Sequence, residues 1–571
     1  MATADERTRQ WFGSEGQISQ LRGAVFKYSC LGATLLALAL VFVFLLYVAN
    51  DAIQPASAST GWLLTVAATI VLPAILLAAY YYFRDTRAGE VAYISFGLPI
   101  VATLLAGGAL VVFRHVVSPH EWFALVIATG VAYGGITLHA RERGAASALE
   151  QFAVRVGVPI LAVVGVPGFA VDRTISTPIL GQELFHLSFS VPTVLPSLRG
   201  LILSLPMLPM DWLSLLLAFT LPVAAVAALR VRAVRESARD AELVAGLIVG
   251  VAAVGFVAAP LVGVVATTWV IVATVVVAPI VLYLESVLRR GEGVAGLAFP
   301  LVVGGGAIVA ALVVQTLGYA GPDLWLDWQF LTDNASVNPE DAGIYPALVG
   351  SIMILIVVAV VAFPIGVGAA IYLEEYAPSQ GRGSKLVELI EINIANLAGV
   401  PSVVYGVLGL AVFVRGVGLS SGIVIVGGLT VALLILPIVI VSAQEAIRAV
   451  PDSLRRASYG MGATKWQTVR SVVLPRAAPG ILTGTILALG RAIGETAPLL
   501  MIAIAAVVRL SPDSFFSLTG AMPRQIFTWS TEIKPEFRYG VLAAGVVTLL
   551  VVMLMMNGTA IALRNRYQRQ E

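Results

Sequence analysis

Uninterrupted apolar runs recur along the whole 571-residue chain. A helix needs about 20 consecutive apolar residues to cross the hydrocarbon core of a bilayer, so each run predicts a membrane-spanning helix. Composition agrees, because 58% of the residues are hydrophobic and only 12% are charged, whereas a soluble domain carries about 25% charged residues. The sequence therefore predicts an all-α polytopic membrane protein.

About fourteen transmembrane helices are predicted from these runs. Eight lie in the first half, at roughly 29–48, 62–83, 91–113, 121–138, 154–171, 212–229, 243–266 and 268–284. Six more follow, at roughly 295–317, 347–373, 399–416, 421–443, 480–508 and 539–563. The segment 172–210 is apolar but interrupted by prolines, which favours an interfacial or re-entrant stretch over a regular helix.

Charge in the connections predicts the orientation of the chain. Arginines gather at every second connection, at 84–87, 141–143, 230–239 and 289–290, whereas the loop 318–346 carries acidic residues and no Lys or Arg. Basic loops stay in the cytoplasm, so that acidic loop is expected outside. We therefore expect a multi-pass protein of the cell membrane whose N-terminus and C-terminus are both cytoplasmic.

Several classes of function are excluded or unsupported by the sequence. The net charge of +2 gives no reason to expect a nucleic-acid partner, and the single cysteine, Cys30, cannot form an internal disulfide. No lysine follows a glycine, so the phosphate-binding loop of an ATPase is absent from the sequence. Residues 119–124 begin like a zinc-protease helix but lack its second histidine. The sequence gives no reason to expect an enzyme, and we expect no metal and no cofactor to be bound by this chain.

The long basic loop 444–479 has the pattern of two short helices. Asp452 or Ser453 could cap the first, which would place Leu454, Ala457 and Met461 on one face. Gly460 and Gly462 should end it, and a second stretch should run from Thr464 to Leu474 and Pro475. Basic amphipathic helices also lie on lipid headgroups, so a membrane-surface helix is an alternative interpretation.

The predicted span 480–508 contains two charged residues, Arg491 and Glu495. Four residues apart, they share one face of a helix and could pair. Because a charge at the bilayer centre costs at least about 2.5 kcal/mol, both should face the bundle interior or an aqueous path. Gly494 and Pro498 should kink the helix beside them. The pair could mark a solute route or simply fix helix packing.

The basic loop resembles the loop signature of ABC importer permeases, in which an EAA triplet, three residues, Gly, nine residues and Ile-x-Leu-Pro follow one another. Here Gly462 is followed, after nine intervening residues, by Val472-Val473-Leu474-Pro475, and the triplet is Arg456-Ala457-Ser458, with Arg in place of Glu. In that family the loop docks on a cytoplasmic ATPase. The resemblance thus implies a docking surface formed by Arg456, Ala457, Ser458, Gly462, Leu474 and Pro475.

The run Arg-Ala-Ile-Gly-Glu-Thr-Ala-Pro-Leu-Leu at 491–500 is similar to a segment of PstA-type permeases of phosphate ABC importers, as are the stretches 368–376 and 400–406. The resemblance implies a six-helix type I permease domain at 286–571, behind an N-terminal extension of about eight helices at 1–285. It also implies a phosphate path at Arg491, Glu495 and Thr496. We interpret the extension as a scaffold rather than a sensor or gate.

The resemblance implies partners as well. These are a PstC-like permease forming a heterodimer, a PstB-like ATPase dimer that uses ATP and Mg, and a PstS-like phosphate-binding protein on the outer loops. A second copy of the docking-loop spacing is absent from the sequence, so the partner permease is expected in trans. Two alternatives stay open: a secondary transporter or channel driven by an ion gradient, and an ABC permease for another oxyanion. Secondary transporters usually have internal repeats, and we find none between the two halves.

Overall fold

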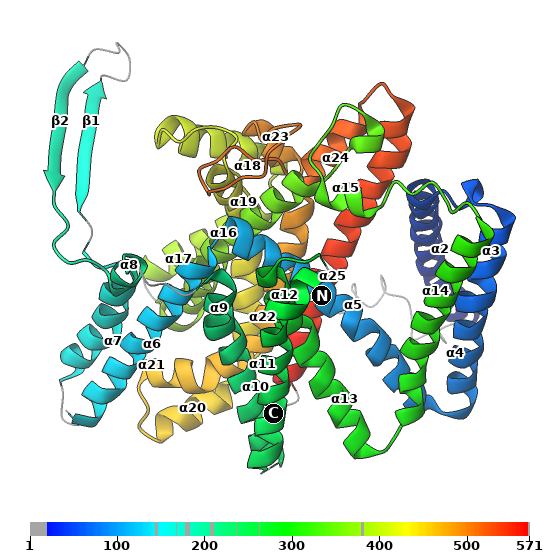
Figure 1. Cartoon of the computed structure of the whole chain (residues 1–571). Coiled ribbons are helices and arrows are strands. Elements are labelled where there is room, and N and C mark those ends of the chain that lie inside the picture. The colour runs from blue at the N-terminus through cyan, green and yellow to red at the C-terminus, as the bar shows by residue number, and fades with distance from the viewer. Residues whose placement is uncertain are drawn as a thin grey trace, which may run out of the picture.

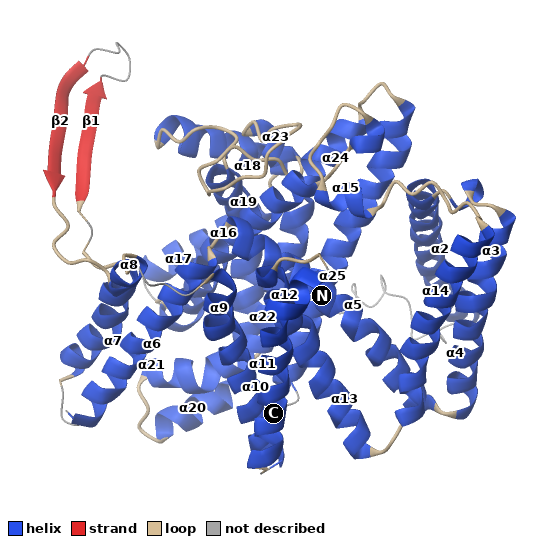
Figure 2. Ribbon diagram, viewed as in Figure 1, coloured by secondary structure: helices blue, strands red, loops and turns tan. Residues whose placement is uncertain are grey.

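The computed structural model describes residues 20–142, 147–166, 168–176, 183–205, 210–235, 237–261, 263–378 and 382–568. Almost all of them are helical (Figure 2). Within these residues twelve helices are long and apolar enough to cross a membrane, and one bent helix pair could form a thirteenth span. The prediction of a helical, polytopic membrane fold is confirmed apart from one β-hairpin, and the expected count of fourteen is close.

The first half consists of one long helix followed by helices that pair as hairpins (Figure 1). The elements are α2 (Gln20–Ile53), η1 (Pro55–Ser57), α3 (Thr60–Val66), η2 (Ala67–Val71), α4 (Leu72–Arg84), α5 (Thr86–His115), α6 (Pro119–Glu142), α7 (Ala148–Val163), α8 (Leu198–Leu203), α9 (Asp211–Leu215), η3 (Leu216–Thr220), α10 (Leu221–Arg235), α11 (Ala238–Leu261), α12 (Ala266–Val272), η4 (Ala273–Val277), α13 (Ala278–Arg290), η5 (Val294–Leu297) and α14 (Ala298–Leu317). The helix α14, expected as the first span of the permease domain, packs against α3, η2, α4 and α5.

A β-hairpin replaces two of the predicted features. The helix α7 ends at Val163, and Gly165 with φ +68° turns the chain. The strands β1 (Phe169–Ser176) and β2 (Glu183–Val191) then pair antiparallel and project from the helices (Figure 1). The predicted span 154–171 therefore ends too late, and the interfacial or re-entrant interpretation of 172–210 is wrong over both strands. Apolar residues at alternate positions of β1 favour a strand, which overall hydropathy does not detect.

The second half is built on three helices, α16, α19 and α22, which pack together. Their contact buries Val358, Ile435 and Ala488 in the largest apolar core of the described residues. The elements are α15 (Trp328–Thr332), η6 (Pro339–Asp341), α16 (Tyr345–Ile371), η7 (Tyr372–Tyr376), α17 (Arg382–Ala398), α18 (Ser402–Gly409), η8 (Leu410–Gly416), α19 (Val424–Arg448), α20 (Asp452–Gly460), α21 (Lys465–Thr468), η9 (Val469–Val473), α22 (Leu474–Gly494), α23 (Ala497–Met501), α24 (Met522–Ser530), η10 (Phe537–Val541) and α25 (Leu542–Gln568).

Two predicted spans of this half differ from the structure. The predicted span 399–416 begins at a sharp bend, where helices 383–398 and 402–416 meet at an angle of 106°. The predicted span 480–508 is wrong at both ends: a continuous helical segment runs from Lys465 to Gly494, and the chain after Met501 is irregular. Glu495 and Pro498 explain the early end, since neither the extended backbone of the first nor the ring of the second continues a helix.

The charged connections sort to opposite ends of the bundle. Figure 1 places α20 and the turn between α13 and α14 at one end, and α15 with the acidic connection before it at the other. This separation agrees with the predicted distribution of charge.

Candidate functional site

Arg491 and Glu495 form the expected ion pair. The Nε of Arg491 donates to Oε1 of Glu495 over 3.0 Å. The geometry differs from the prediction, because α22 ends at Gly494 and Glu495 has an extended backbone at φ −73° and ψ 122°. The carboxylate therefore reaches back to the last turn of α22 from outside the helix.

The expected kink is a complete break in the helix. Thr496 precedes the short helix α23, whose second residue is Pro498, and the Thr496 carbonyl accepts the Leu500 N–H at 3.1 Å. Among the described residues the Thr496 hydroxyl has no hydrogen-bond partner. A carboxylate, a guanidinium and a free hydroxyl thus lie at one interruption of a membrane helix.

The pair faces outward from this chain rather than into its own core. The Arg491 side chain is 48% exposed, the Glu495 side chain is 14% exposed, and Gly494 is exposed between them. Behind them, Ala492 and Leu499 line a cavity of about 10 Å³, room for no more than one water molecule. Because a guanidinium in contact with lipid is costly, this outer face must border a polar path or a protein partner.

The helix α18 supports the break from one side. A Cβ at Gly406 would lie 2.6 Å from Met501 Cβ and 2.9 Å from Pro498 Cα, so only glycine lets α18 approach α23 this closely. The Tyr405 hydroxyl donates to the Leu397 carbonyl at 2.8 Å and thereby ties α18 back to α17. The angle between these two helices is therefore tied to the position of α23.

The first helix of the basic loop is α20, and its start differs from the prediction. Neither Asp452 nor Ser453 caps it, because Pro451 occupies the cap position and Asp452 instead accepts from Arg455 at 3.1 Å. Its end agrees with the prediction: α20 stops at Gly460, and Gly462 has φ +83°. The glycine break is confirmed.

The second helix of the loop, predicted to end at Leu474 and Pro475, continues beyond them. Thr464 caps α21 by a capping box with Gln467, and the helix continues through η9 into α22. Leu474 and Pro475 consequently lie inside one long helix. A hydrogen bond of 2.9 Å between the buried hydroxyls of Ser458 and Thr468 fixes α20 against this helix.

The six predicted docking residues divide into two sets. Ser458 is buried and Leu474 packs against the core, whereas the other four, Arg456, Ala457, Gly462 and Pro475, are exposed. Leu454 also packs inward while Met461 is 83% exposed, so the expected single apolar face with Ala457 is wrong. The surface that α20 and α21 present includes the exposed rings of Tyr459 and Trp466.

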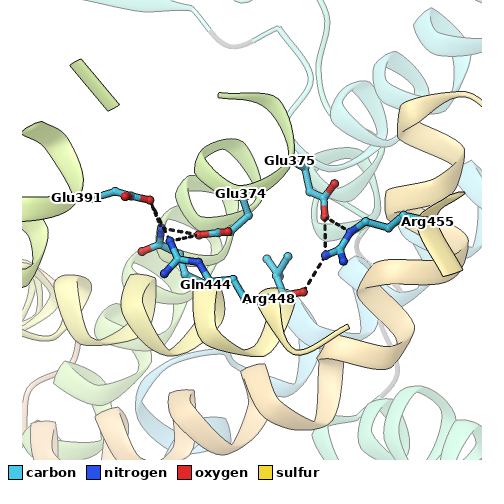
Figure 3. Close-up of polar contacts among 7 residues, drawn as sticks. Glu374, Glu375, Glu391, Gln444, Arg448 and Arg455 are labelled. Atoms are coloured by element: carbon cyan, nitrogen blue, oxygen red, sulfur yellow. Dashed lines mark hydrogen bonds and ion pairs between the residues drawn. The ribbon is translucent and has the colours of Figure 1, made fainter. Parts of the chain in front are cut away.

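Sequence reasoning missed the residue that holds α20 in place. Arg455 donates from Nε to Glu375 Oε1 at 3.1 Å and from Nη2 to the Ile447 carbonyl at 2.8 Å (Figure 3). Its side chain is 15% exposed and that of Glu375 is 6% exposed. The glutamate lies in η7, so the pair joins the loop helix to the end of α16.

The neighbouring carboxylate, Glu374, makes a second set of contacts (Figure 3). It accepts from Arg448 Nη2 at 2.7 Å and from Gln444 Nε2 at 2.9 Å. The same two donors reach Glu391 on α17, at 3.1 and 3.2 Å. The only sequence signal was the adjacent pair of glutamates in the stretch 368–376, and it does not identify a partner.

These features together define a class of protein. Long apolar helices surround a core, an outward-facing ion pair lies at a helix break, and a capped two-helix loop projects at one end. No group of three or more His, Cys, Asp or Glu side chains that could hold a metal occurs in the part of the chain that the structure describes. The arrangement is that of a membrane transport permease.

Comparison with known proteins makes the class specific. Residues 362–567 match the model of the family described as binding-protein-dependent transport system inner membrane component. The probable ABC transporter permease YqgI of Bacillus subtilis is 36% identical over 224 residues, 39% of this chain and 74% of that protein. The phosphate transport system permease PstA of Mycobacterium leprae is 35% identical over 220 residues, 38% and 69% of the two chains. This chain belongs to that family of ABC transporter permeases, as a PstA-type member.

Two further matches complete the comparison. PstA 1 of Mycobacterium tuberculosis is 35% identical over 230 residues, 40% of this chain and 73% of that protein. The solved MetNI methionine ABC transporter, in an inward-facing conformation, is 19% identical to this chain in sequence. The match covers 39% of this chain and 94% of the MetNI chain, with a TM-score of 0.30.

Proposed function

We propose that this chain is the permease subunit of an ATP-driven phosphate importer and forms half of the translocation path. The observation that carries the proposal is the outward face of Arg491, whose half-exposed guanidinium lies at a break in a membrane-spanning helix. Such a group has to be covered by something polar. A second permease packed on this face would enclose a path between the two subunits.

The chemistry of the site suits an oxyanion. A guanidinium presents planar, charge-assisted donors to phosphate oxygens. Glu495 holds that guanidinium at 3.0 Å and would release it when an anion competes for the same donors. The free hydroxyl of Thr496 is a further donor at the same helix break. Phosphate is the substrate we favour because relatives at 35% identity are phosphate transport permeases.

The other components follow from the same proposal. A PstC-like permease would cover Arg491, and a PstB-like ATPase dimer, which uses ATP and Mg, would dock on the exposed surface of α20 and α21. A PstS-like phosphate-binding protein would dock at the opposite end, near the acidic connection 318–346. In this proposal the loop helices and both termini would lie in the cytoplasm.

Transport assays separate this function from the two alternatives. The complex reconstituted in proteoliposomes should accumulate labelled phosphate only with ATP inside the compartment that holds the ATPase. Accumulation driven by an ion gradient without ATP would support a secondary transporter. Preferential accumulation of labelled sulfate or molybdate would support a permease for another oxyanion.

A further inference from the structure

The residues that follow α2 lie beside the residues that follow α14. Beyond α2, the Ser59 N–H donates to the Ala320 carbonyl at 3.0 Å, and the Asp323 N–H donates to Ser57 Oγ at 2.8 Å. The Trp325 N–H then bonds the carbonyl of Ala52 at 3.0 Å. Residues separated by more than 260 positions therefore lie side by side. An inserted domain has this property, because its two ends must meet.

The helix before this point belongs with the permease. α2 packs along α25 and η10, where Val48 and Ala52 form a buried cluster with Ala543. These contacts join the first described helix to the last one. The family match begins only at residue 362, far from α2 in the sequence. Its packing on α25 nevertheless makes α2 a candidate permease helix, separated from the other permease helices along the chain.

The intervening segment consists of four helical hairpins with a shared pattern. They are α3–α5, α6–α7, α9–α11 and α12–α14. Each hairpin has a tryptophan among its first four residues, namely Trp62, Trp122, Trp212 and Trp269. Each also has an arginine at its turn that is followed by a glutamate, namely Glu90, Glu150, Glu242 and Glu292. In three of the four, a five-residue π-helical segment precedes a proline at the second position of the next helix; these prolines are Pro73, Pro222 and Pro279.

Polar contacts join neighbouring hairpins. They connect the second hairpin (α6–α7) to the third (α9–α11), the third to the fourth (α12–α14), and the fourth to the first (α3–α5). His120 Nδ1 lies 2.6 Å from Asp211 Oδ1 between the second and third. Arg289 Nη2 lies 2.5 Å from Asp240 Oδ2 between the fourth and third.

The fourth and first hairpins meet through an ion pair of Arg87 with Glu292, and the Tyr81 hydroxyl donates to the Ala295 carbonyl at 2.7 Å. Contacts between successive repeats are typical of tandem repeat arrays. This order brings the first and last hairpins together, which explains why the chain leaves and returns at one place.

We propose that residues 58–320 are a repeat-built membrane domain inserted between the first helix of the permease, α2, and the remaining permease helices. The permease would then comprise α2 together with residues 321–568. The inserted domain contacts it mainly where α5 packs on α16 and α25, with His115 Nε2 3.0 Å from the Tyr345 hydroxyl. None of its described residues is bonded to Arg491 or Glu495. The boundary expected at 286 would instead divide the fourth hairpin.

Two deletions of unequal size test this proposal. Removing 58–320 and joining Ser57 to Gly321 should leave a chain that assembles with its partners and stimulates their ATPase. Removing only α2, a far shorter segment, should abolish assembly. Loss of ATPase stimulation by an assembled chain lacking 58–320, or normal assembly without α2, would overturn the proposal.

A second measurement on the full chain applies even if the shortened chain fails to fold. Protease sites at 54–58 and 318–322 allow cleavage of the assembled complex, and Val48→Cys with Ala543→Cys, in a Cys30→Ser background, reports contact of α2 with α25. We expect the cross-link and ATPase stimulation to survive cleavage at both sites. Loss of either on cleavage would contradict the insertion. Neither readout depends on the substrate, so failure of phosphate transport would be recognised separately.

Discussion

Arg455 and Glu375 form a nearly buried ion pair, with Nε and Nη2 of the arginine both 3.1 Å from one carboxylate oxygen. The arginine lies on α20 and the glutamate at the end of α16. The adjacent Glu374 is linked through Arg448 and Gln444 to Glu391 on α17. Because α17 leads into α18, which packs on α23, contacts continue from the basic loop to the break beside Arg491.

Replacing Arg455 by glutamine should destabilise the attachment of α20. Removing one partner of a buried ion pair leaves the other charge uncompensated, which costs about 3 kcal/mol. We expect a lower thermal unfolding temperature and loss of ATPase stimulation in the reconstituted complex. Arg456→Gln is the matched control, since that side chain is exposed on the same helix, and its unfolding temperature should equal that of the unaltered chain. Equal effects of both substitutions on unfolding would contradict the assigned role of the pair.

Gly462→Ala should weaken ATPase stimulation through the backbone alone. A Cβ there would meet no atom within 4 Å, but φ is +83°, a conformation that costs an L-residue about 1–2 kcal/mol. Gly460→Ala tests the same loop with equally open space and no positive φ. We expect reduced stimulation only for the variant at 462. Similar ATPase rates for the two variants would show that the turn conformation does not matter.

Gly406→Ala should disturb the break beside Glu495. The new methyl would overlap Met501 and the Pro498 backbone, and overpacking of this kind typically costs about 1–3 kcal/mol. We expect lower stability and slower ATP-dependent uptake. Gly368→Ala is the control, because nothing lies within 4 Å of a Cβ on that glycine of α16. Normal uptake by the Gly406 variant would argue against close packing of α18 on α23 during transport.

Hydropathy and charge were sufficient to predict most membrane helices and the separation of basic and acidic connections to opposite ends of the bundle. Both features follow from the properties of the bilayer. The sequence predicted a kink at Gly494 and Pro498 but not the complete end of α22 at Gly494, because neither hydropathy nor charge specifies the extended backbone of Glu495. Nor could they identify the partner of Glu375, which lies 80 residues away on another helix. The hairpin of β1 and β2 was missed because a mean hydropathy taken over a long window does not register the two-residue period that marks a strand.

On the outward face of α22, Arg491 offers both a positive charge and a planar set of donors. A lysine there would keep the charge but lose the planar, forked donors. We therefore expect Arg491→Lys to retain part of the transport activity and Arg491→Gln to retain none. Arg538→Gln is the control, since Arg538 is an exposed arginine on η10 that stacks over the ring of Tyr539.

The most direct test is ATP-dependent accumulation of labelled phosphate by the complex reconstituted with Arg491→Gln. Complex assembly should be measured on the same preparation. We expect an assembled complex that accumulates no phosphate, beside normal accumulation with Arg538→Gln. Phosphate accumulation at the unaltered rate by the assembled Arg491→Gln complex would contradict the proposed role of Arg491.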